Sequence, residues 1–213
     1  MNAMLLSMAL LWGAPTVPDG TLLFLENSNQ FVALYTGSKT THVAVVINHD
    51  RQPWVYEATP HEVRKLPLAD YYAELGKLNE RRKAGNKIRV WKAEPRATYS
   101  ARQVQAMRTL LDTQLRRRYS IKGYVRGESD GVHCAELAAL TLCASSALDI
   151  ERCQDQSPAM LLERVRPLSR PMTVVAIDEP QTSESWYTRS CNEWPAYSNW
   201  CRWSCWETWT FCW

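Results

Sequence analysis

The chain has 213 residues, of which 46% are hydrophobic and 22% are charged, and its formal net charge at pH 7 is +3. This length and composition are ordinary for a globular protein with one sizeable core, and they do not fit a chain that lacks a core. Because the charge is small for this length, nucleic acid is not an expected partner.

Residues 4–12 form an almost wholly apolar run that is too short to span a bilayer as a helix. The run is typical of the hydrophobic region of a secretory signal, and residues 14–16 offer a small-x-small cleavage pattern. No Lys or Arg precedes the run, and Trp12 disfavours cleavage after Ala14, so a cytoplasmic protein remains the alternative. We expect residues 1–16 to be a signal peptide and the protein to be periplasmic or extracellular. No other stretch is a candidate transmembrane segment.

The first half of the body contains three predicted strands, at residues 21–25, 42–47 and 54–58. A turn over residues 48–52 joins the second and third strands into an antiparallel hairpin. If this turn is centred between His49 and Asp50, His42 lies opposite Glu57 on one face of the hairpin. A register shift by two residues would keep both side chains on that face.

The rest of the body alternates helices with strands, and residues 119–129 form a predicted loop. The helices are expected at 68–83, 100–115, 132–147 and from 157, and the strands at 87–92 and 172–177. Ser100 and Gln103 form a capping-box pattern, and Ser129 or Asp130 is expected to cap the third helix. We therefore predict an α+β domain over residues 19–180, with an antiparallel sheet or partial barrel packed against helices.

Residues 183–213 differ in composition from the body, since they hold seven of the ten tryptophans and four of the seven cysteines. A ladder of indoles that binds a glycan or lipid surface and a misread end of the coding frame both fit this pattern, so no function is assigned to the tail. In an exported protein the four tail cysteines are expected to pair with one another, and the odd total leaves at least one thiol unpaired.

Cys134 is the candidate nucleophile, because a thiol at a helix N-terminus has a lowered pKa. Cys143 and Cys153 lack this position and are expected to be small core or loop residues. A buried cysteine is more often a small hydrophobe than a nucleophile, and spacing alone does not decide between the two, because Cys134 and the candidate base His42 are far apart in the sequence.

Four histidines compete to be the base that a thiol hydrolase needs. His49 lies in the predicted hairpin turn and His61 in the loop that follows the hairpin. His133 is adjacent to the nucleophile, and adjacent residues of a helix diverge by about 100°. His42 remains, and Glu57 would orient it.

Four segments in order resemble the YiiX/YebB-like branch of the NlpC/P60 cysteine peptidases: DGTLLF at 19–24, TTHVAVV at 40–46, VYEA at 55–58 and VHCAEL at 132–137. The resemblance covers about residues 19–177. It implies a circularly permuted papain-like fold, in which the strand with the catalytic histidine precedes the helix with the cysteine. Ala44 stands where the family often has Gly, Ala135 where it has Ser, and His133 replaces an aromatic or aliphatic residue.

The resemblance implies a Cys134–His42–Glu57 triad, with Cys134 as nucleophile, His42 as base and Glu57 as the third member. We expect a cysteine hydrolase that cleaves an amide bond through an acyl-enzyme, with no metal or other cofactor, on cell-wall peptides. Lipid or acyl-amide hydrolysis, acyl transfer and a non-catalytic binding module on the same scaffold remain alternatives. The sequence does not give the oligomeric state.

Overall fold

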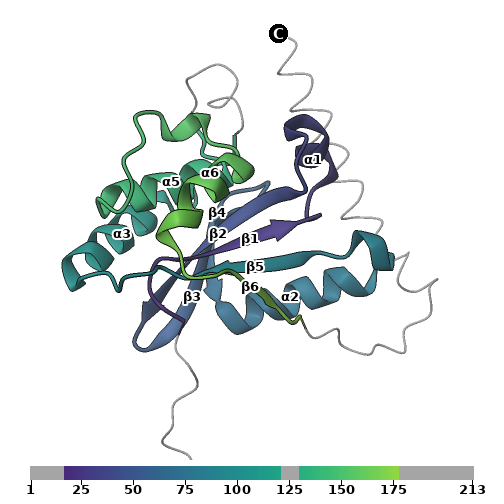
Figure 1. Cartoon of the computed structure of the whole chain (residues 1–213), viewed down its shortest axis with the longest axis horizontal. Helices are drawn as coiled ribbons and strands as arrows, with labels where there is room; N and C mark the ends of the chain where they lie inside the picture. The colour runs from purple at the N-terminus through teal and green to yellow at the C-terminus, as the bar shows by residue number, and fades with distance from the viewer. Residues whose placement is uncertain (1–16, 121–129, 178–213) are drawn as a thin grey trace, which may run out of the picture. The chain divides into compact units, whose positions relative to one another are not determined.

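Six strands form one antiparallel sheet. A computed structural model of the chain describes residues 17–120 and 130–177, and in these ranges the strands lie in the order β4-β3-β2-β1-β5-β6 (Figure 1). Their bounds are Thr21–Glu26 (β1), Thr40–His49 (β2), Gln52–Ala58 (β3), Val63–Pro67 (β4), Arg89–Ala93 (β5) and Thr173–Val175 (β6). Helices pack on this sheet, so the prediction of an α+β fold with an antiparallel sheet is confirmed.

The helices divide between the two faces of the sheet (Figure 1). Helices α3, α5 and α6 cover one face, and α2 covers the other. Their bounds are Gln30–Thr36 (α1), Leu68–Glu80 (α2), Ala101–Gln114 (α3), Cys134–Ala144 (α5) and Pro158–Val165 (α6). Short 3₁₀ turns lie at Ala84–Asn86 (η2), Cys153–Asp155 (η3) and Arg166–Leu168 (η4).

Strand β2 divides its side chains between two hydrophobic cores. Val43, Val45 and Ile47 face α3, α5 and α6, whereas Ala44 and Val46 face α2, and all five are buried. This alternation follows from the two-residue period of a strand. The continuous apolar run that predicted β2 therefore reflects a strand that is covered on both sides.

Several predicted boundaries are confirmed and others need correction. Ser100 and Gln103 form the expected capping box at the start of α3, and Ser157 caps α6. Helix α2 ends at Glu80 rather than at residue 83. Strand β4 was not predicted, because its short sequence VRKLP contains charged residues and ends in a proline.

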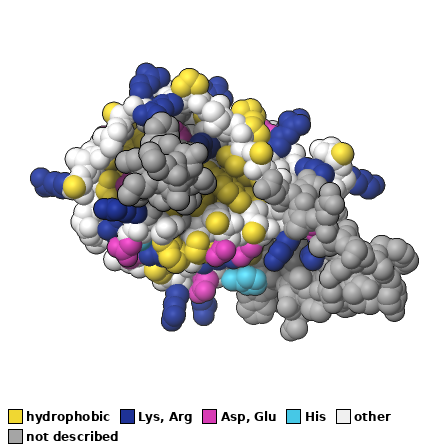
Figure 2. All heavy atoms as spheres, turned by 90° about the horizontal axis from the view of Figure 1, so that it is seen from below, with side chains coloured by type: hydrophobic (Ala, Val, Ile, Leu, Met, Phe, Trp, Pro, Cys, Tyr) yellow, Lys and Arg dark blue, Asp and Glu magenta, His cyan; other side chains and the backbone are white. Residues whose placement is uncertain are grey.

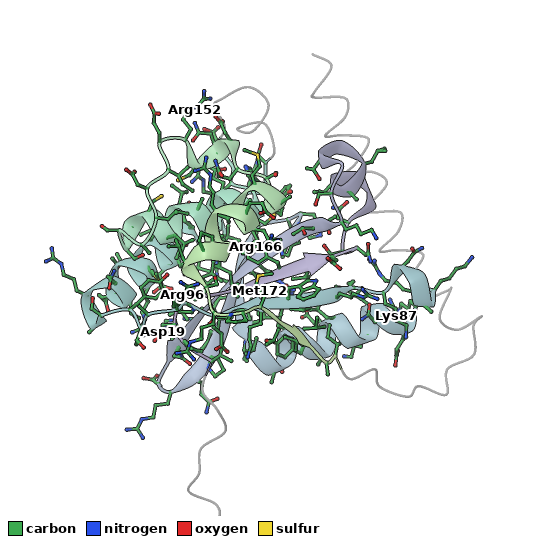
Figure 3. The ribbon with its side chains drawn as sticks, viewed as in Figure 1. Asp19, Lys87, Arg96, Arg152, Arg166 and Met172 are labelled. Carbon is green, nitrogen blue, oxygen red and sulfur yellow. The ribbon has the colours of Figure 1, made fainter. Side chains whose placement is uncertain are left out.

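Asp19, which is labelled in Figure 3, links the N-terminal end of β1 to the β2–β3 hairpin by hydrogen bonds. Its Oδ1 accepts a hydrogen bond of 2.6 Å from the backbone N–H of Asn48 and one of 3.2 Å from that residue's side chain. Gly20 follows with φ of +77°, and a Cβ there would lie 2.4 Å from the Tyr99 ring. The aspartate-glycine pair is therefore needed for backbone conformation and for packing.

On the face shown in Figure 2, the Lys and Arg side chains of the described residues are spread around the outline. Within the described residues no helix is both long and apolar enough to cross a membrane. The predicted signal peptide, most of the predicted loop at 119–129 and the Trp-rich tail lie outside the described residues.

Candidate active site

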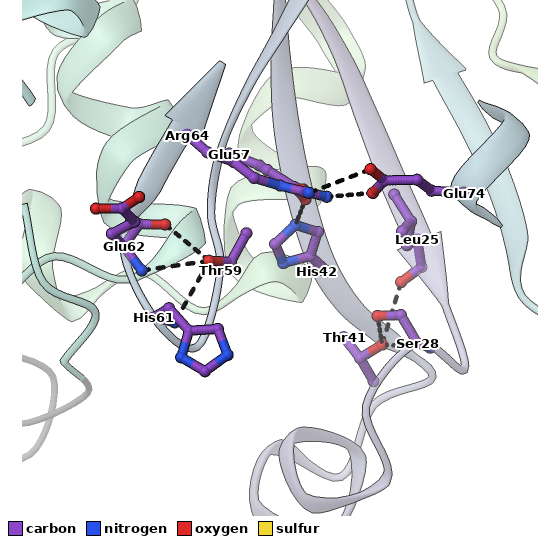
Figure 4. A network of polar contacts seen from close by, with 10 residues as sticks. All are labelled: Leu25, Ser28, Thr41, His42, Glu57, Thr59, His61, Glu62, Arg64 and Glu74. Atoms are coloured by element: carbon purple, nitrogen blue, oxygen red, sulfur yellow. Dashed lines mark hydrogen bonds and ion pairs between the residues drawn. The ribbon is translucent and has the colours of Figure 1, made fainter. Parts of the chain in front are cut away.

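His42 and Glu57 face each other across the β2–β3 hairpin. Nε2 of His42 lies 2.8 Å from Oε2 of Glu57, and a dashed line marks this contact in Figure 4. The side chain of His42 is 17% exposed to solvent, and that of Glu57 is 7% exposed. Two of the three predicted site residues are therefore in direct contact.

The register that brings them together differs from the predicted one by two residues. The hairpin pairs His49 with Gln52 and ends its ladder at Val45 with Tyr56. Its turn is centred on Asp50 and Arg51, whose φ angles are +50° and +64°. Positive φ at both central residues defines the turn type that matches the twist of a two-residue hairpin. A slip of two residues preserves the face of every side chain, which is why the predicted contact survives the wrong register.

The ladder between β2 and β3 stops before it reaches the two site residues. Strand β2 continues to Thr40 paired with β1, and β3 continues to Ala58 paired with β4. At His42 the backbone of β2 pairs with β1, and at Glu57 the backbone of β3 pairs with β4. The backbones of β2 and β3 do not pair with each other at these two residues. We define this feature as the β2–β3 opening. Cys134 belongs to the core on the α5 side of the sheet and interacts with His42 at this opening.

Cys134 is the first residue of α5, and its exposure is 4%. The helix begins there because His133 has extended backbone angles, φ −102° and ψ 169°, and caps it with its own side chain. The expected start near Val132 and the expected cap at Ser129 or Asp130 are corrected accordingly. The first backbone N–H groups of a helix lack intrahelical partners, so the thiol lies at the positive end of the helix dipole.

The electrostatics of the site favour an ion pair. Burial disfavours the charged form of both groups, but their mutual attraction and hydrogen bond outweigh it. The pKa of Cys134 is lowered to about 6, mainly by His42 and then by His133. The pKa of His42 is raised to about 10, first by Cys134 and then by Glu57. Between these values the pair exists as thiolate and imidazolium.

His133 also contacts Cys134, contrary to the expectation that adjacent helical residues point apart. His133 is not helical: it is the cap of α5, and its extended backbone turns the side chain toward Cys134. Its Nδ1 accepts the backbone N–H of Glu136 at 3.3 Å, so Nε2 carries the proton that it donates to the carbonyl of Gln154 at 2.9 Å. The His133 side chain also hydrogen-bonds to Cys134, and this bond and the positive charge of the protonated ring lower the pKa of the thiol.

Arg64 is a further site residue, which was not predicted from the sequence. It lies directly opposite Glu57 on β4, and its Nε donates to Oε1 of Glu57 at 2.8 Å. Its guanidinium also holds Glu74 of α2 at 2.6 Å (Figure 4). Burial alone would raise the pKa of Glu57, but the hydrogen bond to His42 and the charge of Arg64 lower it. A prediction of strand β4 would have placed Arg64 across from Glu57 and so would have found this contact.

The remaining histidines lie away from this cluster, as expected. His49 lies at the hairpin end, where its Nε2 is 2.8 Å from the hydroxyl of Tyr56. His61 is exposed in the turn between β3 and β4. Among residues 17–120 and 130–177, no group of three or more His, Cys, Asp or Glu side chains is arranged to hold a metal ion.

No family model matches the chain, and no curated protein matches it. Its fold is similar to the solved structure of the metalloprotein YiiX (DUF1105) from Escherichia coli O157:H7, with 18% sequence identity and a TM-score of 0.50. The similarity covers 78% of this chain and 99% of that one. At this identity the comparison establishes a shared fold and nothing about activity, so the expected relation to YiiX-like proteins is confirmed for the fold alone.

Proposed function

We propose that the protein is a cysteine hydrolase of the permuted NlpC/P60 type, with Cys134 as nucleophile, His42 as base and Glu57 as orienting acid. The observation that carries the proposal is the hydrogen-bonded chain from the thiol at the start of α5, through the imidazole, to the buried carboxylate of Glu57. A nucleophile, a base and an orienting group in that order are what covalent catalysis by a thiol requires.

The order of elements supports the permuted papain-like scaffold. Strand β2 carries the histidine and comes before α5, which carries the cysteine. The five-strand stretch from β4 to β5 provides the sheet against which that helix packs. The four sequence motifs that resemble the family fall on β1, β2, β3 and the start of α5.

The geometry assigns one role to each nitrogen of His42. Glu57 engages Nε2, which leaves Nδ1 to interact with the thiol. In the proposed reaction the Cys134 thiolate attacks the amide carbonyl, and the backbone N–H at the helix start stabilises the oxyanion. Nδ1–H then protonates the departing amine, and a water molecule, deprotonated by the same nitrogen, releases the acid from the thioester.

Amides are the proposed substrate class, with cell-wall peptides as the preferred members and lipid acyl-amides as the alternative. A metal does not fit this site well. YiiX is called a metalloprotein, but here both carboxylate oxygens of Glu57 are held, one by His42 and one by Arg64. Only Cys134, His42 and His133 remain as candidate metal ligands at the site. Within the described residues they do not form a group that could hold a metal ion.

The first test is the pH dependence of Cys134 alkylation by iodoacetamide in the unaltered protein, in His42→Ala and in His61→Ala. The expected midpoint is about 6 in the unaltered protein and in the control His61→Ala. It should move toward about 8.5, the value of a free thiol, in His42→Ala. Alkylation is read at the peptide that contains Cys134, because the chain has six other cysteines.

A midpoint near that of a free thiol in all three proteins would overturn the proposal and favour a binding module on the same scaffold. A second measurement follows acyl transfer itself. An activated p-nitrophenyl ester should add one acyl group to Cys134 in the unaltered protein. Cys134→Ser should form no thioester, and failure of the unaltered protein to acylate would also count against the enzyme.

A further inference from the structure

Two thiols that the proposed mechanism does not use lie in contact at the far end of the nucleophile helix. Cys143 lies in the last turn of α5, and Cys153 is the first residue of the η3 turn. Their Sγ atoms are 3.5 Å apart. The two sulfur atoms face the same carbonyl, that of Ile150, at 4.0 Å from Cys143 and 3.6 Å from Cys153.

The chain between the two thiols is held in a tight turn. Ser146 has φ of +57°, and the N–H of Ala147 bonds back to the carbonyl of Leu142, as at many helix C-termini. The η3 turn is closed by an ion pair of 2.9 Å between Arg152 and Asp155. Arg152 is labelled in Figure 3 and marks where this turn reaches the surface. The turn therefore keeps the two sulfurs together in the reduced protein.

A disulfide requires a modest movement from this arrangement. Its sulfur atoms are about 2.05 Å apart, so the thiols need to approach by only about 1.5 Å. Cys143 is partly exposed and Cys153 is buried. A reagent from solvent therefore meets Cys143 first, and Cys153 is positioned behind it to attack the adduct.

We propose that Cys143 and Cys153 form a redox pair that low-molecular-weight disulfides such as oxidised glutathione convert to an intramolecular disulfide. The Cys143 thiolate attacks one sulfur of the reagent, forms a mixed disulfide and releases one glutathione thiolate. The Cys153 thiolate then attacks the Cys143 sulfur and releases the second. Two protein thiols and one oxidised glutathione become one protein disulfide and two reduced glutathiones, with both protons passing to the products.

The pair lies one hydrogen bond away from the residue that caps the nucleophile helix. Gln154 follows Cys153, and its carbonyl accepts the hydrogen bond from His133. A bond that draws Cys153 toward α5 therefore acts on the element that positions His133 beside Cys134. The redox pair itself is independent of the proposed hydrolase activity, since neither thiol touches the reacting groups described above.

The test uses the full chain with Cys134→Ser, equilibrated without denaturant in glutathione buffers of graded ratio, then quenched with acid and digested with trypsin. Cleavage after Arg126, Arg152 and Arg164 separates a peptide 127–152 from a peptide 153–164. Because Cys134 is replaced, Cys143 is the only cysteine of the first peptide and Cys153 the only one of the second. A linked pair of these peptides, identified by mass, is therefore specific for the proposed bond.

The linked fraction should rise from about a tenth to about nine tenths over a roughly eighty-fold change in the ratio of oxidised glutathione to the square of reduced glutathione. Adding Cys153→Ser should replace the link by a stable glutathione adduct on Cys143, and adding Cys143→Ser should leave Cys153 largely unmodified. The proposal is overturned if the linked peptides are absent at every ratio, if they appear only in urea, or if either thiol pairs with a tail cysteine instead.

Discussion

The Glu57→Gln variant tests whether the buried carboxylate controls the reactivity of Cys134. Glu57 accepts hydrogen bonds from His42 on one oxygen and from Arg64 on the other. A glutamine offers one acceptor and one donor, so it cannot satisfy both partners. If its amide N–H₂ faces His42, the ring must turn its proton to Nδ1 and can no longer accept the thiol proton. If its oxygen faces His42, the amide N–H₂ meets the Arg64 guanidinium.

The lost charge has a calculable upper limit. Two unit charges about 4 Å apart interact by about 4 kcal/mol at an effective dielectric constant of about 20, which corresponds to roughly 3 pKa units. Arg64 stays positive in the variant, and its charge then disfavours the imidazolium. Because its side chain is 37% exposed, solvent screens part of that charge. We expect the pKa of His42 to fall by roughly 2 units, with the pKa of Cys134 rising in response.

The assay is the pH profile of Cys134 alkylation, combined with ester turnover. The alkylation midpoint should rise from about 6, and kcat/KM should fall by roughly 10² to 10⁴, as when the orienting acid of a serine protease triad becomes an amide. Glu74→Gln is the matched control, because Glu74 is 46% exposed and touches Arg64 but not His42. Equal midpoints in Glu57→Gln and the unaltered protein would refute the claim that the carboxylate acts on the ion pair.

Three further outcomes are expected. The kcat/KM for ester or amide hydrolysis should rise through a pH of about 6, where the thiolate forms. It should fall through a pH of about 10, where the imidazolium loses its proton. A profile that follows neither value would contradict the ion pair. His133→Ala should cost about 1 kcal/mol of unfolding free energy by removing the cap of α5 and should raise the alkylation midpoint, whereas His133→Asn should restore the stability but not the midpoint. Leu137 is only 1% exposed, so Leu137→Ala should lower the free energy of unfolding in urea by about 2–5 kcal/mol. Leu34 is 85% exposed, so Leu34→Ala should change it by no more than about 0.5 kcal/mol. Similar losses for both variants would contradict the core assignment.

Much of the fold follows from local patterns in the sequence. The β-branched residues of β2 predicted a strand, and the Ser100–Gln103 pair predicted the start of α3. The contact of His42 with Glu57 depended only on which face each residue occupies. That property is unaffected by a two-residue error in the turn, so a wrong register still placed the two residues together.

The parts that were missed depend on backbone conformation and on neighbours distant in sequence. The sequence alone does not show that His133 is extended, and without that fact its ring cannot be aimed at Cys134. Arg64 lies on a five-residue strand whose identity depends on pairing with β3. The contact between Cys143 and Cys153 depends on the path of the turn between them, which no periodicity encodes.

The β2–β3 opening has a mechanical consequence. His42 is fixed by β1, and Glu57 by β4, so each belongs to a different half of the sheet. No ladder of backbone hydrogen bonds spans the two halves at the level of the site, and the imidazole–carboxylate contact is one link across that gap. A small change in the twist of one half against the other would alter the 2.8 Å contact far more than it would alter either strand. Amide hydrogen exchange should therefore be slower in the stretch Val45–His49, which pairs β2 with β3, than beside the opening.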